Sequence, residues 1–174
     1  MMFYKVLETC RGPMAFGWQG NSVLKVALPF KTRLGLEKHL SKEWHHFHKS
    51  TGTNDGGWLL RLEDAFIDYF EGIKTDFSWV SLNPPKTEFK ASVYKALRSV
   101  GWGQTISYQE LGLKAGRQRC GRSVGSFMAR NPTPLLIPCH RVLATSRIGG
   151  FSDEGGAEMK RWMLRHEGAI VLQT

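Results

Sequence analysis

The sequence lacks any long apolar run and any recognisable export signal. No stretch approaches the roughly 20 consecutive apolar residues that a transmembrane helix requires. The chain starts Met1, Met2, Phe3, Tyr4, Lys5, without the apolar segment of a secretory signal peptide. These absences predict an intracellular, cytoplasmic protein with no membrane partner. The ordinary share of hydrophobic residues, 41%, predicts a globular one.

Cysteine is also scarce. Cys10, Cys120 and Cys139 are too few and too widely spaced for a disulfide framework or a structural zinc site, and their odd number leaves at least one thiol free. Four of the six histidines crowd into one stretch, namely His39, His45, His46 and His48. Metal binding needs fixed ligand geometry rather than local abundance, so a solvated helix face is the better interpretation. We predict no metal.

Acidic side chains are few in the second half of the chain. Residues 86–174 carry fourteen Lys and Arg against six Asp and Glu, whereas residues 1–85 carry ten against nine. Nearly all of the formal net charge of +9 therefore lies in the second half. A basic segment of this kind favours a polyanionic partner. DNA is one candidate, although RNA or an anionic membrane surface would fit the charge equally well.

The pair Pro84 and Pro85 divides the chain into two predicted domains, residues 1–85 and 86–174. In the first domain, short alternating runs separated by turn residues predict a small antiparallel sheet. The apolar spacing that follows predicts helices. The expected strands are 3–7, 15–18 and 22–28, and the expected helices are 34–48 and 58–71. The fold class is therefore a two-domain α/β protein.

The second domain contains clear helix signals. Thr87 can cap a helix that ends near Gly101, and Ser107 with Glu110 forms a capping box that opens a short helix reaching about residue 116. Another helix is expected over residues 118–130. Two helices joined by a tight connection that contains glycine are typical of a helix-turn-helix.

The expected helix over 118–130 has two distinct faces. Cys120, Val124 and Phe127 share an apolar face, which favours a structural role for Cys120. The opposite stripe carries almost no side chain, because it consists of Gly121, Gly125 and Ala129. Helix packing or close approach of a ligand would each explain this stripe. The surrounding cations favour a nucleic-acid surface, and they are Lys114, Arg117, Arg119, Arg122 and Arg130.

The segment PCHRV, residues 138–142, places a thiol next to an imidazole and a guanidinium. A thiolate is the attacking form of cysteine, and basic or cationic neighbours favour it. Pro132, Pro134 and Pro138 hold the preceding chain extended, so Cys139 would be presented on a stiff arm. A small buried cysteine with a chance histidine neighbour is the alternative.

The longer stretch NPTPLLIPCHRV, residues 131–142, resembles the active-site segment of the O6-alkylguanine-DNA alkyltransferases, also called methylated-DNA–protein-cysteine methyltransferases. The resemblance extends from about residue 87 to 168, and its further matching positions are Tyr108, Arg122, Asn131 and Glu167. It implies a ribonuclease H-like N-terminal domain that supports a mostly helical winged-helix/helix-turn-helix domain carrying the reactive cysteine.

The same resemblance implies the chemistry. Cys139 would attack the alkyl carbon on guanine O6 and keep the group as a thioether, so each molecule would act once and need no cofactor. His140 would act as a base through a water molecule, and Glu167 would orient its imidazole. Tyr108 would serve N3 of the extruded base. The implied substrate is double-stranded DNA containing O6-alkylguanine, with O4-alkylthymine as a second candidate, and the implied state is a monomer.

The resemblance also implies a set of binding residues. Arg122 would take the place of the base that is rotated out of the duplex, although an ordinary phosphate contact is the alternative. Asn131 would tie the DNA-binding helix to the arm, and Val142 and Ser152 would line the base pocket. The predicted DNA-binding set comprises Arg122, Gly125, Lys114, Arg119, Ala129 and Arg130.

Two other functions remain open at the level of sequence. A cysteine hydrolase could use Cys139 and His140, although adjacent residues rarely direct both side chains at each other. A helix-turn-helix protein could bind DNA, or mark lesions in it, without transferring anything. Relatives of the second kind lack the nucleophile, whereas this chain has Cys139.

Overall fold

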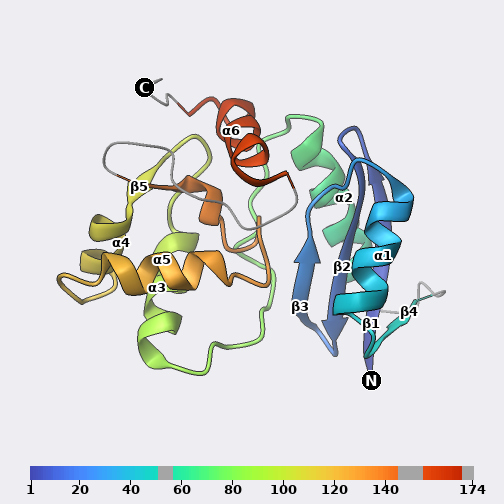
Figure 1. Ribbon diagram of the computed structural model, residues 1–174, viewed down its shortest axis with the longest axis horizontal. Coiled ribbons are helices and arrows are strands. Elements are labelled where there is room, and N and C mark those ends of the chain that lie inside the picture. The colour runs from blue at the N-terminus through green and yellow to red at the C-terminus, as the bar shows by residue number, and fades with distance from the viewer. Residues whose placement is uncertain (51–56, 145–154, 170–174) are drawn as a thin grey trace. The chain divides into compact units, whose positions relative to one another are not determined.

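The computed structural model describes residues 1–50, 57–144 and 155–169. The chain forms two compact units, Met1–Asn83 and Pro84–Thr174 (Figure 1). The boundary lies within two residues of the proline pair, while the different roles expected of the two parts stay a prediction. Within the described ranges, no helix combines the length and apolar character needed to cross a membrane.

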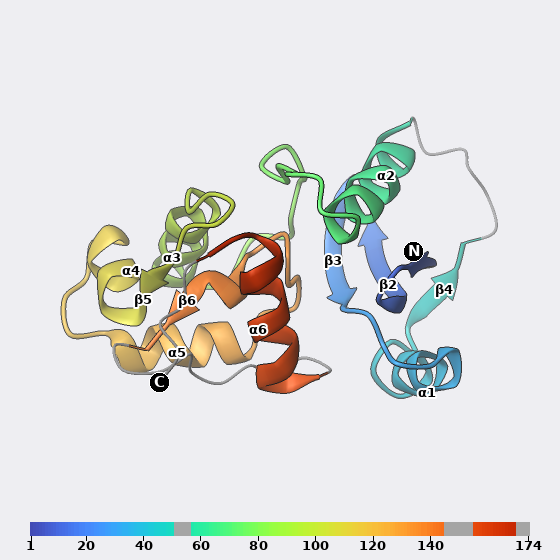
Figure 2. The same ribbon diagram turned by 90° about the horizontal axis from the view of Figure 1, so that it is seen from above.

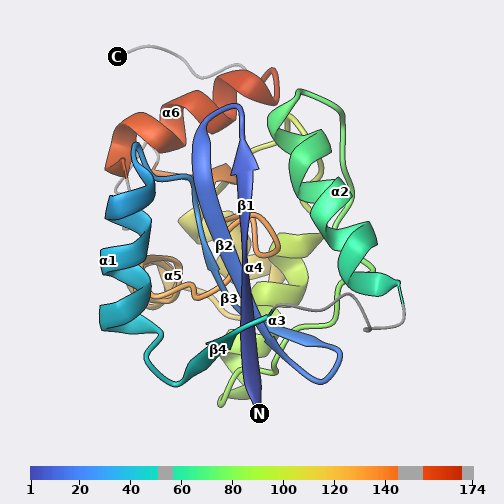
Figure 3. The same ribbon diagram turned by 90° about the vertical axis from the view of Figure 1, so that its right-hand side faces the viewer.

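The N-terminal unit is a four-stranded sheet with a helix on each face. The strands are β1 (Met2–Thr9), β2 (Gly12–Gln19), β3 (Ser22–Ala27) and β4 (Phe47–Lys49), in the order β3-β2-β1-β4. Strands β1, β2 and β3 are antiparallel, as predicted, and β4 joins β1 in parallel. Helices α1 (Arg33–Glu43) and α2 (Trp58–Phe70) lie on opposite sides of the sheet (Figures 2 and 3).

Alternation along β2 explains the two faces. Ala15 packs with Leu36 and Leu40 of α1, whereas the next residue, Phe16, lies 5.6 Å from the ring of Phe66 on α2. The tight connection from β1 depends on glycine at position 12, the first residue of β2, where φ is +110° and a Cβ would lie 2.2 Å from a backbone oxygen.

The prediction of one helix over residues 34–48 is wrong in its second part. Helix α1 ends at Glu43, and Phe47 begins strand β4 at the edge of β1. Helical periodicity could not reveal this, because Trp44 and Phe47 pack together 5.3 Å apart at a spacing that also suits a helix. The four histidines therefore share no helix face. Among the described residues, no three metal-binding side chains are grouped where they could hold an ion.

The C-terminal unit is mostly helical, as predicted. Its helices are α3 (Glu88–Arg98), α4 (Tyr108–Lys114), α5 (Gly121–Ala129) and α6 (Gly156–His166), with one 3-10 turn, η1 (Cys139–Arg141). Strands β5 (Ile106–Ser107) and β6 (Val142–Leu143) pair in parallel. Thr87 caps α3, and Ser107 with Glu110 forms the predicted capping box of α4. The starts of α3 and α4 could therefore be predicted from the sequence.

The second helix of the predicted helix-turn-helix begins three residues later than expected. Arg119 has φ of +50°, and Cys120 occupies the N-cap position of α5 without a side-chain capping bond. The Cys120 thiol instead donates to the carbonyl of Arg117 at 3.1 Å. The left-handed residue turns the chain sharply, so the connection between α4 and α5 is tight.

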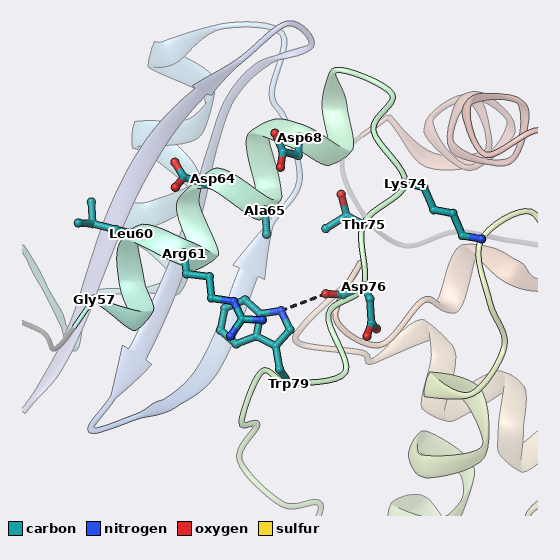
Figure 4. A pocket seen from close by; sticks show the side chains of 10 residues that line it. All are labelled: Gly57, Leu60, Arg61, Asp64, Ala65, Asp68, Lys74, Thr75, Asp76 and Trp79. Atoms are coloured by element: carbon teal, nitrogen blue, oxygen red, sulfur yellow. Dashed lines mark hydrogen bonds between the residues drawn. The ribbon is translucent and has the colours of Figure 1, made fainter.

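A hollow of about 520 Å³ lies on the N-terminal unit beside α2 (Figure 4). Arg61 stacks on the ring of Trp79 at 4.1 Å, and the Trp79 indole donates to the carbonyl of Asp76. The residues that line this hollow include side chains of both charges but no cysteine and no histidine. The hollow therefore offers no nucleophile of the kind expected at the site of chemistry.

Candidate active site

The arm before Cys139 is held by a single asparagine. The Asn131 amide nitrogen donates to the carbonyl of Ile137 at 2.8 Å, and its oxygen accepts from the backbone of Thr133 at 3.1 Å. Asn131 follows Arg130, the C-cap of α5, so these bonds fix the arm to the helix. The arm also turns back on itself at Leu135, a buried residue with φ of +70°. The prolines do not leave it fully extended.

The same asparagine reaches the sulfur. Its amide nitrogen lies 3.1 Å from Cys139 Sγ and donates to it. Cys139 begins η1 and is 3% exposed, so almost all of its surface is covered. An N–H donor directed at a buried sulfur stabilises negative charge on it. The arrangement suits a nucleophile better than a purely structural cysteine, which requires no such donor.

His140 and Glu167 form the predicted pair. Nε2 of His140 lies 2.6 Å from Oε1 of Glu167, and both side chains are completely buried. Because a carboxylate can only accept, Nε2 carries the hydrogen and donates it. Nδ1 of His140 is then the basic nitrogen, and it has no hydrogen-bond partner among the described residues. A buried nitrogen with a free lone pair is a ready proton acceptor.

The electrostatics keep this pair in one protonation state. Burial lowers the pKa of His140 below its ordinary value of 6.5, so the imidazole is neutral at neutral pH. Burial alone would raise the pKa of Glu167, but the hydrogen bonds and charges of His140 and Arg141 outweigh it and hold that pKa at about 2. The site therefore pairs an ionised carboxylate with an uncharged base.

Two buried cations complete the site. The sequence marked Arg141 only as a cationic neighbour of the thiol, and it indicated no role for Lys160. Arg141 contacts both oxygens of Glu167, and Lys160 on α6 donates to the carbonyl of Val142 at 2.7 Å. Burial lowers the pKa of Lys160 to about 8, although a thiolate at Cys139 would oppose the shift. The position of Lys160 next to Met159 and one turn before Leu164, both buried, was the available signal.

Tyr108 and Val142 belong to the same unit as Cys139, and their roles at the site stay predictions. Burial raises the pKa of Tyr108, and a thiolate at Cys139 would raise it further, so the phenol stays protonated and able to donate. Val142 is fully buried in β6. Ser152, the remaining predicted pocket residue, lies outside the described residues.

The predicted DNA-binding residues belong to α4, α5 and their connection. Exposed side chains among them are Lys114, Arg119, Arg122, Ala129 and Arg130. Gly125 faces Tyr108, where a Cβ would lie 3.9 Å from the ring, and Gly121 faces Tyr108 and Gln109 in a similar way. Packing of α5 against the start of α4 thus accounts for part of the glycine stripe. The contribution of these residues to DNA binding stays a prediction.

A separate glycine in α4 sets how closely α5 approaches. A Cβ at position 112 would lie 2.2 Å from Cys120 Sγ and 3.3 Å from the Arg117 carbonyl oxygen. We expect Gly112→Ala to lower the free energy of unfolding by about 1–2 kcal/mol, because overpacking outweighs the better helix propensity of alanine. Urea denaturation would measure the change.

The matched variant is Cys120→Ala in the Gly112→Ala background, which removes the clashing sulfur and should restore most of the lost stability. Gly125→Ala is the control, since a Cβ there meets only ordinary contact distances. Equal stability of Gly112→Ala and Gly125→Ala would show that the contact with Cys120 is not limiting.

Comparison with known proteins gives this arrangement a family. Residues 88–169 match the family model "6-O-methylguanine DNA methyltransferase, DNA binding domain". The chain is 38% identical to the methylated-DNA–protein-cysteine methyltransferase of Metallosphaera sedula, over 67% of this chain and 72% of that one. It is 33% identical to the Salmonella typhimurium protein of that name, over 79% and 78%. The chain belongs to the methylated-DNA–protein-cysteine methyltransferase family.

Solved structures agree over nearly the full length. The Mycobacterium tuberculosis O6-methylguanine methyltransferase matches with a TM-score of 0.73 and 27% identity, covering 99% of this chain and 97% of that one. A structure of the M. tuberculosis protein in complex with DNA matches with a TM-score of 0.74 and 28% identity, covering 95% and 92%. The predicted fold class and the predicted class of enzyme, a methyltransferase of DNA repair, are confirmed.

Proposed function

We propose that Cys139 is the acceptor in direct reversal of O6-alkylguanine in double-stranded DNA. Two buried hydrogen bonds carry the proposal. One runs from the Asn131 amide to the Cys139 sulfur, and the other joins His140 to Glu167. This set supplies a stabilised sulfur, a neutral base and a fixed carboxylate partner within one short segment and the end of α6. Nucleophilic alkyl transfer requires these three parts.

The proposed reaction balances without a cofactor. The Cys139 thiol gives its proton, through water, to His140 Nδ1, and the sulfur attacks the alkyl carbon. An S–C bond forms while the O6–C bond breaks, and the electron pair stays on guanine O6. Tyr108 donates a proton to N3 of the departing base, and the proton on His140 later returns to the phenolate through solvent. Because a thioether has no leaving group at neutral pH, each molecule acts once.

Access to the lesion requires the base to leave the stack. The family match of residues 88–169 to a DNA-binding domain supports docking through α4 and α5. We propose that exposed Arg122 fills the space left by the rotated base, which offsets part of an unstacking cost of a few kcal/mol. The cations at positions 114, 119 and 130 would contact phosphates. We further propose that the protein acts as a monomer on DNA in the cytoplasm.

The cysteine hydrolase is disfavoured by the family to which the chain belongs. The lesion-marking alternative differs from the proposal in one measurable outcome. After incubation with duplex DNA containing O6-methylguanine, intact mass spectrometry should show a gain of one methyl group per chain, located on the peptide that contains Cys139. Unmodified DNA is the control. Binding of the lesion without any gain in mass would contradict the proposal.

A further inference from the structure

Three nitrogen atoms of the Arg141 guanidinium donate hydrogen bonds. Its Nε donates to Glu167 Oε2 at 2.8 Å and its Nη2 to Glu167 Oε1 at 3.0 Å, so the guanidinium spans both carboxylate oxygens. Its Nη1 donates to the carbonyl of Val100 at 2.6 Å. Arg141 is buried, with only 9% of its surface exposed. Desolvating a guanidinium is costly, and this cost needs an explanation.

We propose that Arg141 is a positioning residue for alkyl transfer: by pairing with both oxygens of Glu167, it keeps that carboxylate ionised and leaves His140 uncharged, so that His140 Nδ1 can take the proton of Cys139. The proposal rests on the function proposed above and adds a residue to it. In this role Arg141 acts through Glu167 and His140.

The physical argument concerns the charge that His140 senses. A buried carboxylate alone beside an imidazole attracts a proton to the pair, either as an imidazolium or as a neutral carboxylic acid. An imidazolium cannot accept the thiol proton. A protonated Glu167 would donate to Nε2, which would leave the hydrogen on Nδ1. The guanidinium already neutralises Glu167, so a proton on His140 gains little, and the observed bond from Nε2 keeps Nδ1 basic.

The surrounding backbone fixes the carboxylate in this orientation. Besides Arg141 and His140, Glu167 Oε2 accepts from the backbone N–H of Gly103 at 3.4 Å. Gly103 has φ of +73°, and a Cβ there would lie 2.8 Å from the carbonyl oxygen of Glu167. The link from Arg141 to Val100 holds the guanidinium at the end of α3. Arg141 therefore links its own turn η1 to Val100 and to Glu167. Neutralising the carboxylate would not require this link to Val100, which suits a residue that fixes the position of Glu167.

The test is the pH dependence of single-turnover methyl transfer to Cys139, measured for the wild type and for Arg141→Met. The variant removes the charge and keeps an unbranched apolar side chain. We expect the acid limb of its rate profile to move upward by at least about one pH unit, which lowers the rate at pH values on that limb about tenfold. Arg141→Lys keeps a charge but loses the two-pronged contact, and it should fall between the two.

Arg161→Met is the matched control, because it removes the same charge from an exposed position on α6. Its profile should coincide with that of the wild type. A rate that falls equally at all pH values in Arg141→Met, with the limb unmoved, would overturn the proposal and indicate a structural role only. Should Arg141→Met fail to fold, an unmoved limb in Arg141→Lys would overturn it in the same way.

The outcomes separate this inference from the proposed function. If the wild-type protein takes up no methyl group from lesion DNA, the function itself is wrong, and the inference fails with it. If the wild type transfers the group and the acid limb of both Arg141 variants stays in place, only the role of Arg141 is wrong.

Discussion

Replacing Cys139 with alanine is expected to abolish methyl uptake completely while lesion DNA still binds. The substitution removes the only atom proposed to form a bond with the alkyl group, so no slower route through the same site remains. The side chain is small and 3% exposed, so its loss changes little of the surface that DNA would meet. Intact mass measures the uptake, and a gel-shift titration with O6-methylguanine duplex measures binding.

The matched control is Cys10→Ala. Cys10 is an exposed thiol of the N-terminal unit, and its sulfur donates to the Phe70 carbonyl at 3.1 Å. Cys10→Ala should take up one methyl group per chain as the wild type does. Continued uptake by Cys139→Ala would move the acceptor to another residue. Loss of lesion binding together with uptake would show that the sulfur is needed to recognise the base.

The fold could be predicted where a local signal determined it. Hydrophobic alternation identified β1, β2 and β3, and the capping residues Thr87 and Ser107 marked the starts of α3 and α4. Strand β4 could not be found in this way, because it is three residues long and is defined by pairing with the edge of β1. Tertiary contact overrode the local preference there. The start of α5 was missed because nothing local required Arg119 to adopt a positive φ.

The site divides along similar lines. Cys139 and His140 were evident as neighbours in the sequence, and the family resemblance supplied Glu167, 27 positions away from His140. Residues alone could not join that pair, since only the packing of α6 brings it together. Arg141 was visible within PCHRV as a cation, but its hydrogen bonds point to Glu167 and Val100, which a sequence does not reveal. Lys160 lies on the apolar stripe of α6, so helical spacing alone could have predicted its burial.

Glu167→Gln should produce the largest loss of stability. Glutamine cannot neutralise Arg141, so a buried guanidinium would be left without its counter-charge. The glutamine NH2 group would also point at an N–H donor of Arg141 or His140. Breaking a buried ion pair from one side costs about 3–5 kcal/mol. The proposed base would also lose the partner that stabilises it, which lowers the rate of transfer by roughly 100- to 10,000-fold. Denaturation in urea and single-turnover mass measurements give the two quantities.

The double variant Glu167→Gln/Arg141→Met distinguishes the two effects. Removing both charges eliminates the unpaired guanidinium, so most of the lost stability should return, whereas transfer should remain slow because no carboxylate contacts His140. If the double variant is as unstable as Glu167→Gln, the pair matters for packing more than for charge. Recovery of the transfer rate along with stability would contradict the role of Glu167 as the partner of the base.

The acid stability of the wild type should reveal the same pair. The folded-state pKa of Glu167, about 2, lies below its ordinary value of 4.5, so its ionised form contributes stability that is complete above pH 4.5 and is lost as pH falls toward 2. The lowered pKa of His140 adds a loss that begins as pH falls below 6.5, since the unfolded chain then binds the extra proton. In Glu167→Gln the free energy of unfolding should depend much less on pH between 4.5 and 2. A wild-type stability that stays constant from pH 6.5 to 2.5 would show that these two groups do not carry the charges that we assign to them.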